Sequence, residues 1–159
     1  VKAIQAGWSL ERILERLDAL RKATEVVFTL ETLTYLQRGG RIGRVQALAG
    51  SLLNLKPLIH VNREDGKYDT VGRARGIKRA LEDLARHLTN MYPKETPVWV
   101  SVMHGQAEAQ ALALAKMLEE GLNVARIEIL RVSPILGVHT GPGVIGATIV
   151  PMALAEIEG

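Results

Sequence analysis

The sequence predicts an α/β fold in which a mixed β-sheet of about six strands is packed with helices. Short runs of β-branched and aromatic residues alternate with longer segments in which apolar residues recur every three or four positions. Two of the short runs flank Arg63-Glu64-Asp65-Gly66, a turn signal that indicates an antiparallel hairpin. No internal repeat, low-complexity segment or linker divides residues 1–159, so we expect a single domain.

The first third of the chain predicts a helix, a strand and two further helices. Ser9 can cap the first helix, because its side chain can accept a hydrogen bond from the helix N-terminus, and the leucines that follow share one face. Gly39-Gly40 can end the second helix. The expected elements are a helix from Leu10 to Lys22, a buried strand from Thr24 to Leu30, a short helix from Glu31 to Gln37 and a helix from Val45 to Leu55.

The remainder predicts a strand-rich domain with two amphipathic helices. Pro93 ends one of these helices and Gly121 is the stop signal of the other. The expected helices run from Ile77 to Met91 and from Ala107 to Glu120, and the expected strands are Leu58 to Val61, Tyr68 to Arg73, Val98 to Met103, Ala125 to Val132, Ile135 to Val138 and Val144 to Val150.

Composition limits the class of protein. A hydrophobic content of 47% is enough for a core that folds alone, and a net charge of +3 does not require a nucleic-acid partner. The absence of cysteine excludes disulfides and thiolate sites. No apolar run approaches the length that spans a membrane and no signal segment leads the chain, so we expect a cytoplasmic protein.

The segment around Gly39-Gly40 predicts an anion site beside an apolar wall. Arg38 and Arg41 flank the two glycines, and such a turn lets both guanidinium groups approach one anion. The run from Val45 to Leu55 mixes small residues with leucines, of which Leu48 and Leu52 can line a ligand. A site of this kind suits an amphiphilic acid. The alternatives are a solvent-exposed helix end for Arg38 and an ordinary core helix for the apolar run.

The late segment His139-Thr140-Gly141-Pro142-Gly143 predicts a second part of that site. Its glycines begin a match to the dinucleotide motif G-x-G-x-x-G, but strand-forming residues follow where that fold needs a helix, so we reject a nucleotide site. Glycines on both sides of Pro142 instead allow a turn whose amides converge on an anion, with His139 and Thr140 adding side-chain bonds. The residues alone favour the alternative of a structural loop whose histidine bonds a buried carbonyl, because single histidines are usually structural.

These motifs together resemble the DegV family of bacterial fatty-acid-binding proteins. The resemblance rests on Leu33 to Ile59, on the turn and basic strand from Asp65 to Arg75, and on His139-Thr140-Gly141-Pro142-Gly143. It covers nearly the whole chain but only the C-terminal domain of the family. It therefore implies the C-terminal domain of a DegV-type fold, with the family's N-terminal domain absent from this chain.

The resemblance implies a function and a ligand set. In the family, hydroxyl residues of the N-terminal domain hold the fatty-acid carboxylate, and the two motifs present here complete a polar network. Carried over by motif, the ligand-binding residues are Arg41 and His139, with Thr140, Gly141 and Gly143 in the loop, Arg38 as a lesser candidate, and Leu48 and Leu52 along the tail. The resemblance also implies that a bacterial lipid carrier presents its fatty acid to a separate kinase.

The basic strand is a candidate docking surface. Arg73 and Arg75 lie on one strand face by alternation, with Lys78 and Arg79 close behind. The family resemblance makes the first two candidates for docking the fatty acid kinase. The alternative is an edge strand protected from aggregation by its charge.

No other motif predicts chemistry. The histidines lack metal-ligand spacing, the serines lack a nucleophile elbow, and no P-loop occurs, so we expect no metal, no cofactor and no enzymatic activity. The alternative function is a basic nucleic-acid-binding or regulatory module that uses Arg38, Arg41, Arg44 and the cluster from Arg73 to Arg79. The modest charge and the absence of a DNA-binding motif favour the lipid carrier.

Overall fold

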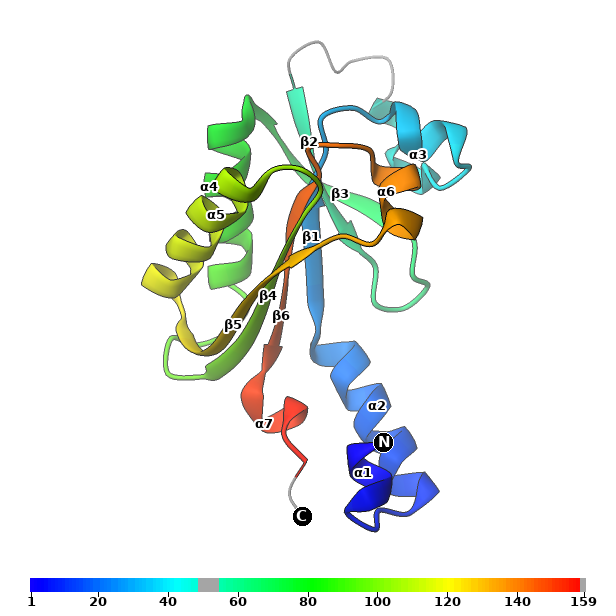
Figure 1. Ribbon diagram of the computed structural model, residues 1–159, viewed down its shortest axis with the longest axis vertical. Helices are drawn as coiled ribbons and strands as arrows, with labels where there is room; N and C mark the ends of the chain where they lie inside the picture. The colour runs from blue at the N-terminus through cyan, green and yellow to red at the C-terminus, as the bar shows by residue number, and fades with distance from the viewer. Residues whose placement is uncertain (49–54, 158–159) are drawn as a thin grey trace.

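The computed structural model describes residues 1–48 and 55–157. Its centre is a six-stranded mixed sheet in the order β3-β2-β1-β6-β4-β5 (Figure 1). Only β4 and β5 are parallel to each other, and the other neighbouring pairs are antiparallel. The strands are β1 Glu25–Thr29, β2 Leu55–Val61, β3 Tyr68–Arg75, β4 Pro97–His104, β5 Asn123–Arg131 and β6 Ile145–Pro151. The predicted mixed sheet with helices is confirmed.

Two long helices cover one face of the sheet, which we call the closed face (Figure 1). They are α4 Ile77–Thr89 and α5 Glu108–Gly121. The inward positions of α4, such as Leu81, Leu84 and Leu88, are 4%, 0% and 0% exposed and pack with Val27 and Val100 of the sheet. The larger of the two hydrophobic cores therefore lies on this face. The side chains of α4 that face the sheet are removed from water and packed closely against their neighbours.

A buried carboxylate also lies on the closed face. Glu25 is only 3% exposed, and its carboxylate accepts hydrogen bonds from Nη2 of Arg63 at 2.6 Å and lies 2.8 Å from Nε2 of His87. Nδ1 of His60 lies 3.3 Å from the same carboxylate. Burial raises the pKa of Glu25, but the hydrogen bonds from His87 and Arg63 outweigh burial and hold that pKa below its ordinary value.

Short elements cover part of the opposite face, which we call the open face. They are α3 Thr34–Arg38, the 3-10 helix η1 Gly43–Leu48 and α6 Pro134–Thr140 (Figure 1). A smaller core of Phe28, Leu36, Val45, Ile59 and Val144 lies beneath them. The alternation along β1 explains the division, since Val27 faces the larger core and Phe28 faces the smaller one.

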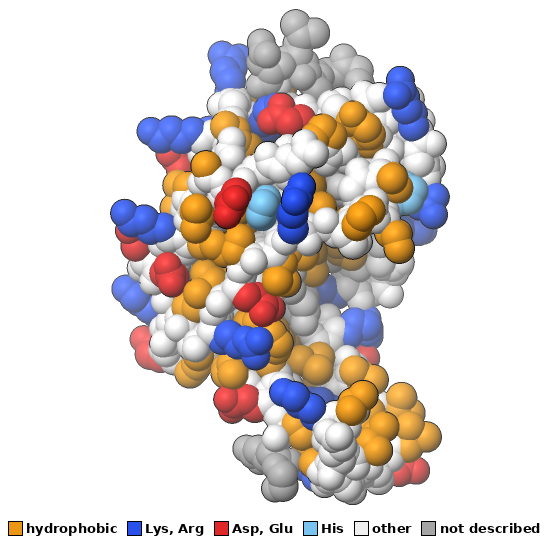
Figure 2. Space-filling model, viewed as in Figure 1, with side chains coloured by type: hydrophobic (Ala, Val, Ile, Leu, Met, Phe, Trp, Pro, Cys, Tyr) orange, Lys and Arg blue, Asp and Glu red, His pale blue; other side chains and the backbone are white. Residues whose placement is uncertain are grey.

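The first helices lie beyond the end of the sheet at which β1 begins and β6 ends, beside α7 Met152–Ala155 (Figure 1). They are α1 Lys2–Gln5 and α2 Leu10–Ala23, and Ser9 caps α2 by accepting a bond from the amide of Arg12 at 3.3 Å. The predicted amphipathic face of α2 leaves Leu10, Leu14 and Leu17 at 68%, 56% and 56% exposed. Figure 2 shows apolar side chains gathered over these helices and over α6.

Two sequence predictions are wrong. Ile135 to Val138 belongs to helix α6, because Ser133 accepts a bond from the amide of Leu136 as an N-cap and Pro134 occupies the first turn. The helix predicted from Val45 to Leu55 is instead a 3-10 helix that ends at Leu48, and Leu55 already begins β2. Residues 49–54, including Leu52, lie outside the described residues.

The hairpin is confirmed. β2 and β3 pair antiparallel around residues 62–67, and β3 forms one edge of the sheet. Within residues 1–48 and 55–157, no helix is long and apolar enough to cross a membrane.

Candidate functional site

Three segments that are distant in sequence meet at one end of the sheet. β6 pairs with both β1 and β4, so Ile145 lies opposite Thr29 on one side and opposite His104 on the other. The segments that leave these residues are 30–42, 105–107 and 139–144. Strand pairing therefore brings the predicted Gly39-Gly40 turn and the His139 segment to the same place.

The Gly39-Gly40 turn ends α3 in a glycine-dependent way. The amide of Arg41 donates to the carbonyl of Leu36 at 2.8 Å, and the amide of Gly40 donates to that of Gln37 at 3.1 Å, which is the Schellman pattern. Gly40 has φ +67°, a conformation that side-chain-bearing residues rarely adopt. The prediction that these glycines end a helix is confirmed.

Gly39 has no side chain because His139 occupies the space. A Cβ atom added to Gly39 would lie 2.3 Å from Nδ1 of His139. That nitrogen is buried and has no hydrogen-bond partner among the described residues. The two predicted motifs thus touch each other, and a polar atom at their contact is left without a partner, which is costly unless a ligand or water supplies one.

The two arginines lie close to this contact on exposed positions. Nη1 of Arg41 donates to the carbonyl of Gly39 at 2.6 Å, so the guanidinium folds back over the turn. Arg38 ends α3 and makes no hydrogen bond or ion pair within residues 1–48 and 55–157. Their convergence on one anion stays a prediction.

The glycines of the late segment serve close packing. Gly141 and Gly143 have φ +76° and +77°, and a Cβ at Gly141 would lie 2.3 Å from the ring of Tyr35. A Cβ at Gly143 would lie 2.5 Å from Cγ of Glu31. Their amides donate to the carbonyls of Gly137 at 2.8 Å and Gly105 at 2.7 Å, so the expected set of amides that converge on an anion does not include these two.

An apolar cavity of about 140 Å³ lies on the open face beside α6. Thr140 contributes to its wall but points its hydroxyl back along the helix, donating to the carbonyl of Leu136 at 3.0 Å. His139 therefore contacts the Gly39 turn and Thr140 contacts the cavity, because neighbouring helical residues point in different directions. The lining residues are Val26, Phe28, Val61, Tyr68, Met103, Val132, Leu136, Thr140, Val144 and Gly146.

The sequence prediction placed the apolar wall on the run from Val45 to Leu55, and this stays a prediction because residues 49–54 lie outside the described residues. Of the run from Val45 to Leu55, Val45 is buried in the core of the open face, Leu48 ends η1 and Leu52 lies outside the described residues. The described walls of the cavity come from the sheet, from α6 and from Val132 and Val144. Alternation along β1 marks Val26 and Phe28 as facing away from Val27, but the reading of Ile135 to Val138 as a strand hid the contribution of α6.

The basic edge lies on β3, two strands from β1 in the sheet. Arg73 and Arg75 are both exposed on β3, two residues apart, opposite Pro57 and Leu55 of β2. Arg73 also lines a groove of about 320 Å³ between β3 and α4, together with Arg79, Asp83 and Arg86. Within the described part of the chain, no cluster of three or more metal-binding side chains occurs.

Comparison with known proteins places these features in a wider group. The family model DegV, described as uncharacterised proteins, matches residues 1–152. A DegV domain-containing protein of Clostridium perfringens is 38% identical over 146 residues, which are 92% of this chain and 51% of the relative. One from Deinococcus radiodurans is 37% identical over 151 residues, 95% of this chain and 53% of the relative. The chain spans about half the length of the curated relatives it matches.

Solved structures share the fold. A fatty-acid-binding DegV family protein from Thermus thermophilus superposes with a TM-score of 0.87 at 33% identity, over 94% of this chain and 53% of that one. A fatty-acid-binding DegV family protein from Streptococcus agalactiae gives 0.84 at 26% identity, over 94% and 52%. A stearic-acid-binding protein from Eubacterium ventriosum gives 0.81 at 26% identity, over 98% and 54%.

Proposed function

This chain belongs to the DegV family, and we propose from that premise that it is the fatty-acid-binding half of a bacterial lipid carrier without chemistry of its own. The observation that carries the proposal is the contact between the Gly39 turn and His139. It leaves a buried, unpartnered nitrogen on the residue next to Thr140, which lines the apolar cavity, and Arg41 is bonded to the same turn. A head group and a tail site in this arrangement suit a long-chain carboxylic acid, and the solved relatives named above bind such acids.

The tail provides most of the binding energy in this proposal. An acyl chain of roughly 15 methylenes offers about 12 kcal/mol before entropy costs, at about 0.8 kcal/mol for each buried methylene. A hydrogen bond from the head group adds about 1–3 kcal/mol. We therefore assign affinity to the cavity, and orientation of the carboxylate to His139 and Arg41.

The cavity is too small for the whole tail. Its volume of about 140 Å³ lies below the roughly 300–1,000 Å³ of ordinary ligand pockets. The remaining walls must come from elsewhere. We propose that the half of the protein that matches the rest of the relatives' length packs against the open face and supplies them. Ile135 and Val138 on α6, which are 80% and 65% exposed, suit such a contact.

The tail site is tested by filling the cavity. Val132→Phe places a ring among the lining residues, and Val71→Phe, on the edge strand β3 outside the lining, makes the same chemical change as a control. Native mass spectrometry of the complete protein should show a fatty-acid adduct in the wild type and the control. Val132→Phe should weaken binding about tenfold or more, because the ring takes the space of several methylenes.

The head-group site is tested in the same experiment. His139→Ala should weaken fatty-acid binding about tenfold through loss of one polar contact, with little change in the bound chain lengths. Equal adducts in the wild type, His139→Ala and Val132→Phe would contradict the proposed site. A wild-type protein that takes up no added fatty acid would contradict the proposed function.

We further propose that the basic edge docks a fatty acid kinase, which phosphorylates the presented carboxyl group. Arg73→Glu with Arg75→Glu should lower the kinase turnover about tenfold and leave fatty-acid affinity unchanged, because charge complementarity acts on docking. Lys116→Glu, at an exposed position of α5, is the control for charge reversal. Unchanged turnover in the double variant would argue against this docking surface.

A further inference from the structure

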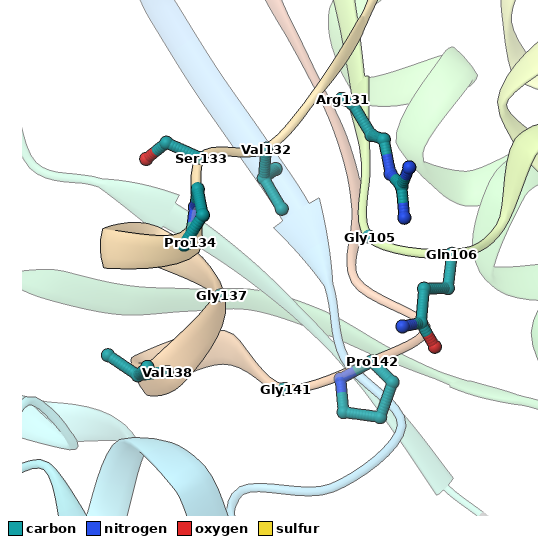
Figure 3. A pocket seen from close by; sticks show the side chains of 10 residues that line it. All are labelled: Gly105, Gln106, Arg131, Val132, Ser133, Pro134, Gly137, Val138, Gly141 and Pro142. Carbon is teal, nitrogen blue, oxygen red and sulfur yellow. The ribbon is translucent and has the colours of Figure 1, made fainter.

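A second candidate site lies at the end of β4 and β5. Two adjoining cavities of about 580 and 640 Å³ share Gln106 and Arg131 in their linings. In Figure 3 the side chains of Arg131 and Gln106 lie on one side of the first cavity, across from α6. Neither cavity is lined by Arg38, Arg41 or His139. The first shares Val132 and Gly141 with the fatty-acid site, whereas the second, lined by His104 and Glu108, shares no residue with it.

His104 supplies a buried hydrogen-bond donor to the second cavity. The residue is 8% exposed and lines that cavity. Its Nδ1 accepts a bond from the amide of Ala107 at 3.3 Å, so the neutral ring carries its proton on Nε2. Within the described part of the chain, Nε2 has no partner. This N–H is therefore free to donate to a ligand in the second cavity, which His104 lines.

Gln106 is held in a costly backbone conformation. Its φ of +59° is the only positive value at a residue other than glycine within residues 1–48 and 55–157. Such a conformation costs on the order of 1 kcal/mol or more, and strained residues cluster at ligand sites. Its side chain lines both cavities. This backbone conformation places the side-chain amide of Gln106 in the lining of the second cavity, which His104 also lines.

Arg131 brings a positive charge that the protein leaves unpaired. Its guanidinium makes no ion pair and no hydrogen bond with the residues described, although several other arginines on this protein pair with carboxylates. It ends β5 opposite His104 of β4, in register with it.

The N-terminus of α5 opens onto the same space. This helix has 14 residues, and its N-cap, Ala107, makes no side-chain cap bond. The orphan amides of its first turn therefore add donors and a partial positive charge. Glu108, also in the lining, brings one opposing negative charge.

We propose that His104, Gln106, Arg131 and the start of α5 bind a tetrahedral oxyanion of the phosphate class. The donors come from a strand end, a strained turn, a neighbouring strand and a helix terminus. They approach from several directions, which matches the oxygens of a phosphate better than the two coplanar oxygens of a carboxylate. The carboxylate of Glu108 repels a bound anion and so lowers the affinity of the site. Only anions that accept bonds from several of the donors overcome this repulsion.

Titration of the chain with inorganic phosphate at constant ionic strength tests the proposal. The ¹H–¹⁵N signals of the His104 ring should shift saturably, and Arg131→Gln should weaken phosphate binding about tenfold by removing a charge-assisted bond. Gln106→Gly, which accepts the same backbone conformation, should also weaken binding. Glu108→Gln should strengthen it by removing the like charge.

Arg126→Gln is the matched control. It removes the same charge from the same strand, but Arg126 pairs with Glu128 and lines neither cavity. Its affinity for phosphate should equal that of the wild type, and circular dichroism should show every variant folded. Acetate in place of phosphate should bind at least tenfold more weakly. A His104 ring that phosphate does not shift, equal losses in Arg131→Gln and Arg126→Gln, or equal binding of acetate would each overturn the proposal.

Discussion

The two faces of the sheet are built differently. On the closed face, α4 and α5 press long rows of leucine and alanine against the strands, and the positions that face the sheet are almost completely buried. On the open face, three short elements cover only part of the strands and leave the cavity beside α6. Glycines at 39, 141 and 143 let the covering loops approach one another closely.

This difference separates stability from binding. A close-packed face has no space for a ligand, and any removed atom leaves a void that neighbours cannot fill. A face covered by short elements and tight turns has fewer packing contacts, so a substitution there removes less stabilisation. It also leaves space for a ligand. We therefore expect substitutions on the closed face to act on the free energy of unfolding, and those on the open face to act on ligand binding.

The largest effect should come from the core of the closed face. Leu84 of α4 is 0% exposed, so Leu84→Ala should lower the free energy of unfolding by about 2–5 kcal/mol. Leu136 of α6 is 38% exposed, and Leu136→Ala should cost about 1 kcal/mol. Denaturant unfolding of both variants measures the difference. Equal costs would show that the two faces are packed alike.

Gly141→Ala should disturb the open face through its backbone. Its φ of +76° disfavours alanine, and the added Cβ would meet the ring of Tyr35. We expect a loss of about 1–3 kcal/mol in the free energy of unfolding and a larger relative loss of fatty-acid binding. Combining it with Tyr35→Ala removes the clash but not the strain, so recovery should be partial. Full recovery would mean that backbone strain at Gly141 is unimportant.

Glu25 makes the stability of the closed face depend on pH. Because the pKa of Glu25 is lowered in the folded protein, its ionised form stabilises the fold above the ordinary glutamate pKa of about 4.3, and this contribution is lost as pH falls through the lower folded pKa. Glu25→Gln should therefore cost about 1–3 kcal/mol at pH 7 and less as the pH falls below about 4. Unfolding curves at both pH values measure this. A cost that does not depend on pH would argue against an ionised Glu25.

Sequence patterns predicted most of the fold and only part of the site. The hairpin of β2 and β3 and the helix α4 followed from a turn signal and from apolar spacing, which act over a few residues. The site motifs at Gly39-Gly40 and His139 were also recognisable, although their roles stay predictions. The apolar lining of the cavity was missed, because Phe28, Met103 and Val132 lie on different strands or loops and no linear spacing connects them.

Helix α6 shows that a helix cap can outweigh the strand propensity of the residues that follow it. Ile135 and Val138 are residues that strands favour, and the cap at Ser133 with Pro134 is the local signal that decides for a helix. Local chemistry thus decided where helices and turns begin and end, because capping bonds and backbone conformations depend on near neighbours. The tertiary structure alone decided that β6 lies between β1 and β4. That pairing brings His139 to Gly39 and His104 to Arg131, because contacts between distant segments depend on strand order, which no local pattern specifies.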